Sequence, residues 1–199
     1  SKEAAMNFQN VEFLISAASP KDFPGKRLPE IAFAGKSNVG KSSVINRLLQ
    51  RKSMAKVGDK PGKTVHVNYF LLDKTCYLVD LPGYGFAKVP QAEKDRWAKL
   101  MEDYFAANRI TLGVLIVDYR HPPTNNDITM ARWFLDSGCP FVVLANKKDK
   151  LKKSELEPNL ATIRADLELP ESCPVIPFSA EKGDGRDELV KCILNAVKA

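Results

Sequence analysis

Blocks of apolar and polar residues follow one another along this chain and predict strands and helices in turn. Short runs that are almost wholly apolar, at residues 31–34, 112–118 and 141–145, are typical of strands buried on both faces of a sheet. Longer segments carry apolar residues three and four positions apart, which indicates amphipathic helices. Such helices are expected at residues 43–50, 92–108, 127–137, 156–167 and 189–197.

Three further strands complete the predicted sheet, at residues 66–72, 76–81 and 175–178. The first two are joined by only three residues, so they should be antiparallel neighbours. Because the other strands alternate with helices, we predict a three-layer α/β fold. Its sheet has six strands, is mostly parallel with one antiparallel edge strand, and is covered by helices on both faces. The apolar cluster at 11–15 is interpreted as a short packed segment within an irregular lead-in, residues 1–30.

Length and composition indicate one domain over residues 1–199, since 44% of the 199 residues are hydrophobic. No apolar run is long enough to span a membrane. The start has no signal-peptide pattern and the end has no prenylation box, so we expect no membrane attachment. The four cysteines lie far apart without a CxxC pair, which favours reduced thiols and a cytoplasmic protein. We expect a monomer.

The charge is unevenly placed. The net charge is +6, but residues 20–63 hold eleven lysines and arginines against three acidic residues, so this segment is +8 and the rest of the chain is −2. Part of this charge would face bound phosphates. The remainder is either an ordinary solvated surface or one that attracts nucleic acid.

One stretch predicts a phosphate-binding loop, with two glycines five positions apart followed by Lys and Ser: Gly35-Lys36-Ser37-Asn38-Val39-Gly40-Lys41-Ser42. It lies between a predicted strand and a predicted helix, so several backbone N–H groups and the positive end of the helix dipole would meet at one point. Lys41 would reach the β- and γ-phosphates of a nucleoside triphosphate, and the Ser42 hydroxyl would hold Mg²⁺.

Two segments are placed to sense the γ-phosphate. Asp80-Leu81-Pro82-Gly83 ends a strand, where Asp80 can hold Mg²⁺ through a water and the Gly83 N–H can bond the γ-phosphate. Thr64 lies in a polar loop, residues 51–65, where it is placed to give Mg²⁺ a second hydroxyl; the alternative is a β-branched residue at the start of a strand. The loop Pro61-Gly62-Lys63-Thr64 would then move away when the γ-phosphate leaves.

Two other segments are placed to read the base. Asn146-Lys147-Lys148-Asp149 ends the strand at 141–145, and the Asp149 carboxylate can accept from both N1–H and the 2-amino group of guanine. Adenine offers neither donor, so a carboxylate facing it would lose charged hydrogen bonds. Lys147 can lie over the base and Asn146 can bond its edge or join the loops. Ser179-Ala180 follows the last strand, where a backbone N–H can meet the guanine O6. We therefore predict binding of GTP and GDP.

These elements in this order resemble the Ras-like GTPase fold, and more closely the bacterial EngB family, also called YihA or YsxC. The carrying stretches are Phe33-Ala34-Gly35-Lys36-Ser37-Asn38-Val39-Gly40-Lys41-Ser42-Ser43, Lys60-Pro61-Gly62-Lys63-Thr64, Val79-Asp80-Leu81-Pro82-Gly83-Tyr84-Gly85 and Asp118-Tyr119-Arg120-His121-Pro122. The resemblance runs from about residue 8 to the end. It departs in Lys36 and Lys63, which stand where arginine is frequent.

The resemblance implies a cytoplasmic GTPase that acts late in assembly of the large ribosomal subunit, with precursor rRNA and ribosomal proteins as partners, and that is needed for normal cell division and septum formation. It adds Ser43, Gly62 and Lys63 to the residues expected around the nucleotide, and it makes Lys41, Thr64, Gly83 and Asn38 the candidate catalytic residues.

Tyr84 stands where Ras-like enzymes often have the glutamine that orients the attacking water, so slow hydrolysis is expected. In the wider group, an Asn at the position of Asn38 goes with stimulation by K⁺; the alternative is that Asn38 is a turn residue. A second interpretation of the whole chain also stays open, in which it is a guanine-nucleotide sensor that hardly hydrolyses GTP.

Overall fold

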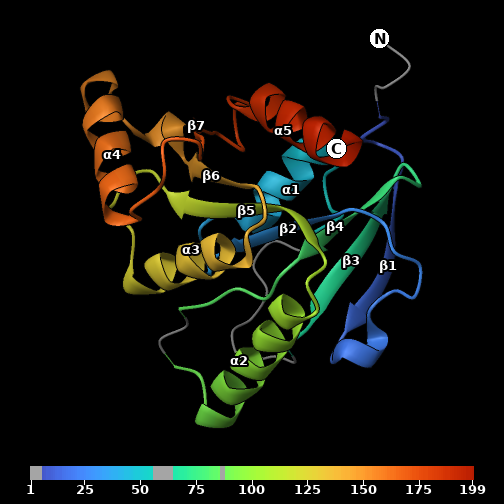
Figure 1. Ribbon diagram of the computed structural model, residues 1–199. Helices are drawn as coiled ribbons and strands as arrows, with labels where there is room; N and C mark the ends of the chain where they lie inside the picture. Colours follow the sequence, from blue (N-terminus) through green and yellow to red (C-terminus); the bar gives the residue numbers. More distant parts are fainter. Residues whose placement is uncertain (1–5, 56–64, 86–87) are drawn as a thin grey trace.

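The computed structural model describes residues 6–55, 65–85 and 88–199 and contains one seven-stranded sheet with the strand order β1-β3-β4-β2-β5-β6-β7 (Figure 1). The strands are β1 (Val11–Ala17), β2 (Glu30–Gly35), β3 (Val67–Leu72), β4 (Cys76–Asp80), β5 (Ile110–Asp118), β6 (Phe141–Asn146) and β7 (Val175–Pro177). The α-helices are α1 (Lys41–Leu49), α2 (Gln91–Ala106), α3 (Asn125–Ser137), α4 (Lys153–Asp166) and α5 (Arg186–Lys198).

Helices cover both faces of the sheet, which confirms the predicted three-layer α/β architecture (Figure 1). On one face α1 and α5 pack their apolar stripes, including Val44, Leu48 and Ile193, against the sheet. On the other face α2, α3 and α4 do the same. The strands β2 and β6 are buried along their whole length, as the apolar runs at 31–34 and 141–145 predict, and the polar residues at their ends, Glu30 and Asn146, are buried as well.

The predicted strand count of six is one too low, because the segment at 11–17 is strand β1. It pairs antiparallel with β3 at the edge of the sheet, from Val11 opposite Leu72 to Ala17 opposite Val67. The antiparallel strand β3 is therefore covered by β1 instead of forming the edge itself. A bulge between Phe13 and Ile15 interrupts the alternation of side chains, and β1 is largely exposed. The sequence of this segment therefore showed neither a clear alternation of apolar and polar residues nor a wholly apolar run, the two patterns that predict a strand.

The apolar stripe of α2 belongs to the core. Leu100, Met101 and Tyr104 are buried, and Trp97 packs beside them on the core cluster. Within the described residues, no helix is both long and apolar enough to cross a membrane. All four cysteines are free thiols, two of them buried.

Candidate nucleotide-binding site

The turn between β2 and α1 requires its glycines. Gly40 precedes the helix with φ +96°, and a Cβ atom there would lie 2.5 Å from Nδ2 of Asn146. A Cβ at Gly35 would lie 2.9 Å from Cγ1 of Val39. A side chain at either position would force these neighbouring side chains to move, and at Gly40 it would also strain the backbone. The sequence therefore folds here into a tight loop at the N-terminus of α1, the arrangement that the phosphate-loop prediction needs.

Lys41 and Ser42 occupy the first turn of α1, and Lys41 forms an ion pair with Asp80 at the end of β4. Both side chains of this pair are largely buried. The structure thus brings together the ammonium expected on phosphate and the carboxylate expected near Mg²⁺. The Ser42 hydroxyl and the Asp80 carboxylate are hard oxygen donors, which are the ligands that Mg²⁺ prefers, so these residues fit that ion.

The segment after β4 packs directly on the phosphate loop. The Leu81 N–H donates to the Phe33 carbonyl at 3.0 Å, and the Ser37 N–H donates to the Tyr84 carbonyl at 2.7 Å. A Cβ at Gly83 would lie 3.6 Å from the Gly35 carbonyl oxygen and 3.7 Å from the Ser37 nitrogen. Gly83 therefore lies beside the Gly35 carbonyl and the Ser37 amide of this loop.

The side chain of Tyr84 turns away from this loop into the core. Its hydroxyl donates to Oδ1 of Asp127 at 2.5 Å, and the residue is 5% exposed. Burial and the neighbouring carboxylate raise the pKa of Tyr84 well above its ordinary value. Asp127 lies in the first turn of α3 and forms a capping box with Thr124. In this arrangement the side chain after Gly83 serves the packing of α3 on the sheet.

Asn146, at the end of β6, joins the two halves of the site. Its Nδ2 donates to the Val39 carbonyl at 3.0 Å, and its Oδ1 accepts from the Ala180 N–H at 3.3 Å. The residue is 2% exposed. Lys147 follows with φ +77°, and its Nζ donates to the Asn38 carbonyl at 3.1 Å. One strand end therefore holds the phosphate loop and the loop after β7 together.

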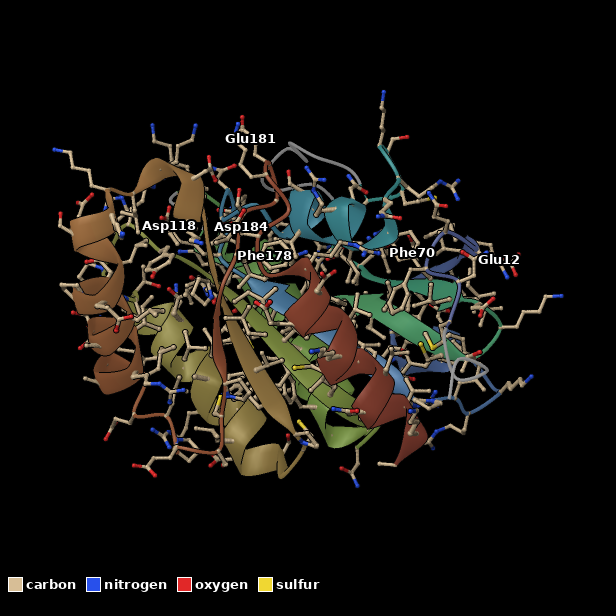
Figure 2. The ribbon with its side chains drawn as sticks, turned by 90° about the horizontal axis from the view of Figure 1, so that it is seen from above. Glu12, Phe70, Asp118, Phe178, Glu181 and Asp184 are labelled. Atoms are coloured by element: carbon tan, nitrogen blue, oxygen red, sulfur yellow. The ribbon has the colours of Figure 1, made fainter. Side chains whose placement is uncertain are left out.

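Asp149 and Ser179 meet on the opposite side of this strand end. The Ser179 hydroxyl donates to Oδ1 of Asp149 at 2.7 Å, and this bond lowers the pKa of the Asp149 carboxyl below its ordinary range. The carboxylate is therefore ionised at neutral pH, the form that can accept from guanine. Figure 2 shows Glu181 and Asp184, from the loop after Ser179, on the side of the molecule where Asp118 ends β5.

Sequence reasoning missed Arg47, which holds the loop after β7 against α1. Its Nε donates to the Ala180 carbonyl at 2.7 Å, and Arg186 of α5 in turn donates to the Leu48 carbonyl at 2.8 Å. No local signal distinguishes Arg47 from any exposed arginine on a helix. The two bonded groups lie more than a hundred residues apart in the sequence.

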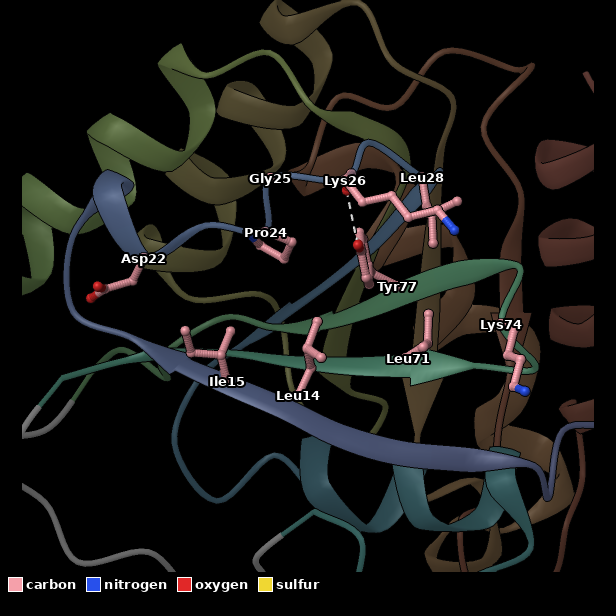
Figure 3. Close-up of a pocket in the computed structure, with 10 residues that line it drawn as sticks. All are labelled: Leu14, Ile15, Asp22, Pro24, Gly25, Lys26, Leu28, Leu71, Lys74 and Tyr77. Carbon is pink, nitrogen blue, oxygen red and sulfur yellow. Dashed lines mark hydrogen bonds between the residues drawn. The ribbon is translucent and has the colours of Figure 1, made fainter.

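Gly62, Lys63 and Thr64 lie outside the described residues, so their predicted roles stay predictions. The other predicted site residues lie at the carboxyl ends of β2, β4, β6 and β7, in the segments that follow these strands and in the first turn of α1. They are Gly35 to Ser43, Asp80, Gly83, Asn146, Lys147, Asp149, Ser179 and Ala180. A cavity of about 570 Å³ lies at the opposite end of the sheet, between β1, β3 and residues 22–28 (Figure 3). None of the predicted site residues that the structure describes lines this cavity.

Comparisons with known proteins agree with this geometry. A family model described as "50S ribosome-binding GTPase" matches residues 30–147. A probable GTP-binding protein EngB of Pelotomaculum thermopropionicum is 44% identical over 94% of this chain and 96% of the relative. A protein of the same description from a Geobacillus species is 43% identical over 92% and 95% of the two chains. The crystal structure of a probable GTP-binding protein engB superposes with a TM-score of 0.66 and 26% identity, over 85% of this chain and 98% of that one.

Proposed function

The chain belongs to the EngB family of GTP-binding proteins, and from this premise we propose that it is a molecular switch in ribosome assembly. In this proposal it hydrolyses GTP to GDP and phosphate on a precursor of the large ribosomal subunit. It works in the cytoplasm as a monomer with one nucleotide-binding domain. Its contribution to cell division and septation would follow from that assembly step.

One observation carries the proposal. Asn146 and Lys147, which follow each other at the end of β6, bond the carbonyls of Val39 and Asn38 in the phosphate loop. Asp149, two residues further on, is an ionised carboxylate beside Ser179. A site for a phosphate tail and a site for a guanine base are therefore rigidly joined, at the spacing of a single strand end.

Each residue then has a defined task. Lys41 leaves Asp80 and places its ammonium on the β- and γ-phosphates, while the Gly83 N–H bonds the γ-phosphate. Ser42, Thr64 and, through water, Asp80 hold Mg²⁺. When bound, this ion neutralises charge on the phosphate oxygens. Asp149 accepts from the guanine edge, and the Ala180 N–H exchanges its 3.3 Å bond to Oδ1 of Asn146 for one to the guanine O6, which excludes adenine.

Hydrolysis by the protein alone should be slow. Tyr84 is bonded to Asp127 and has no amide with which to orient a water. The exposed Asn38, at φ +67° in the phosphate loop, offers an amide oxygen to K⁺, a cation that would add positive charge near the transferred phosphoryl group. The assembling subunit is the other expected source of stimulation.

Exposed basic residues support a partner that contains RNA. Within residues 20–55, the exposed cations are Lys21, Lys26, Arg27, Lys36, Arg51 and Lys52. Among the described residues, Arg51 is the one of these six whose side chain donates a hydrogen bond to another protein group, the Gln9 carbonyl. The ammonium and guanidinium groups of these residues could pair with phosphates of rRNA.

Two measurements test the proposal. Titration of the full chain with GTP, GDP and ATP, with and without Mg²⁺, should show binding of the two guanine nucleotides only. Replacement Asp149→Ala should abolish that preference, whereas equal affinity for ATP would refute guanine recognition. Multiple-turnover GTPase assays with purified precursor large subunits, in K⁺ and in Na⁺, then test the switch. If no condition raises turnover, the sensor function is favoured, which the buried Tyr84 also fits.

A further inference from the structure

The segment Asp118-Tyr119-Arg120-His121-Pro122 follows β5 and has no task in the site as described so far. Its backbone nevertheless supports the end of β6, because the Tyr119 N–H donates to the Asn146 carbonyl at 2.8 Å. The Tyr119 side chain is fully buried, and its hydroxyl donates to the Leu156 carbonyl in α4 at 2.9 Å. The segment is therefore fixed to the strand that precedes Lys147.

The Asp118 carboxylate is held in one orientation. Arg120 donates to it through Nε at 3.0 Å and Nη2 at 2.9 Å, one bond to each oxygen, and the Arg120 backbone N–H donates a third at 2.9 Å. Such a two-pronged pair fixes both position and plane. Burial alone would raise the pKa of Asp118, but these bonds and the charge of Lys147 outweigh it and lower the pKa to about 2.

The same carboxylate reaches Lys147. Its Oδ2 lies 3.4 Å from Nζ of Lys147, and the two side chains are 23% and 27% exposed. Nζ also donates to the Asn38 carbonyl. Contacts thus run from Arg120 through Asp118 and Lys147 to the phosphate loop. A lysine side chain loses about 2 kcal/mol of conformational entropy when it is fixed, so contacts that hold it in advance reduce what a ligand must offset.

We propose that Asp118 is a positioning residue for guanine-nucleotide binding. Oriented by Arg120, it holds Lys147 against the Asn38 carbonyl, so that the stem of Lys147 is arranged to cover the base before the nucleotide arrives. This inference rests on the proposed function, which places guanine between Lys147 and Asp149. It gives the Asp118-to-Pro122 segment a task in binding, exerted through another residue.

A double-mutant cycle on the full chain tests the proposal, with a fluorescent GDP analogue as the probe. Asp118→Asn should weaken binding about tenfold, mainly through faster dissociation, since the geometry is pre-arranged. In the Lys147→Gln background, Asp118→Asn should weaken GDP-analogue binding less than about twofold, because the ammonium group that Asp118 holds is no longer present. The matched control is Asp184→Asn, which removes a carboxylate paired with Lys148 in the neighbouring loop at 2.8 Å and should leave affinity unchanged.

Unchanged affinity in Asp118→Asn would overturn the proposal, and so would an equal loss in both backgrounds, which would mean that Asp118 acts without Lys147. If the Asp118→Asn protein does not fold, Arg120→Gln takes its place in the cycle, with an expected loss of about threefold that disappears in the Lys147→Gln background. A loss of the same size in both backgrounds again refutes it. The proposed function is tested separately, by the titration of the unmodified chain with GTP, GDP and ATP. If that titration shows no preference for guanine nucleotides, the proposed function is refuted.

Discussion

Asn146 and Asn46 can be compared to distinguish an effect on stability from an effect on nucleotide binding. Asn146 bonds the Val39 carbonyl and the Ala180 N–H, and so joins the phosphate loop to the loop after β7. Asn46, in α1, bonds the carbonyl and the N–H of Ala55 at 3.0 and 2.8 Å. Both residues are buried, at 2% and 7% exposure, and each makes two hydrogen bonds to backbone. Only Asn146 lies between the two halves of the site.

Replacement of either asparagine by alanine leaves two buried backbone groups without a partner. Each such group costs about 1–3 kcal/mol, so Asn146→Ala and Asn46→Ala should each lower the free energy of unfolding by about 2–6 kcal/mol. For a chain of this length, that corresponds to a fall of about 4–24 °C in Tm. The two variants should therefore look alike in a thermal or chemical denaturation of the nucleotide-free protein.

Nucleotide binding should distinguish them. Without Asn146 the two loops are no longer held at one spacing, and a loss of about 2 kcal/mol would weaken GDP binding about thirtyfold. Asn46→Ala should leave affinity within about twofold of the unmodified protein, below half a kcal/mol. Fluorescence titration with a GDP analogue below the melting temperature of both variants measures the difference. Equal weakening by the two variants would show that Asn146 contributes only stability, and the reasoning would be wrong.

Two further outcomes are expected. Tyr84→Phe leaves Oδ1 of Asp127 unpaired and should cost about 1–3 kcal/mol in chemical denaturation, while GDP affinity stays unchanged; a changed affinity at unchanged stability would contradict the buried role of this side chain. The pKa of Asp118 falls from 3.8 to about 2 on folding, so its stabilisation is full above pH 3.8 and is lost as the pH falls through about 2. Between about pH 4 and pH 2 the nucleotide-free protein should lose about 2 kcal/mol more stability than Asp118→Asn, and parallel curves in acid denaturation would exclude this contribution.

The residues of the candidate nucleotide-binding site could be predicted from the sequence because they come in short, contiguous motifs. Gly35 to Ser42 can form a phosphate loop only if the glycines adopt angles and contacts closed to other residues, and the structure shows such contacts at Gly35 and Gly40. The order of strands and helices, which predicts the layers of the fold, follows in the same way from local periodicity. The apolar runs at 31–34 and 141–145 were correctly predicted as buried strands, β2 and β6, for this reason.

Tertiary structure alone decided what joins these motifs. Strand β1 has no clear alternation of its own, and its partner β3 lies some fifty residues away, so only the completed sheet makes it an edge strand. Three contacts depend on groups that meet only after folding: Tyr84 with Asp127, Arg47 with the Ala180 carbonyl, and Asp118 with Lys147. A sequence pattern shows which residues are neighbours along the chain. The three contacts join segments that are distant in the sequence, and packing sets the spacing of those segments.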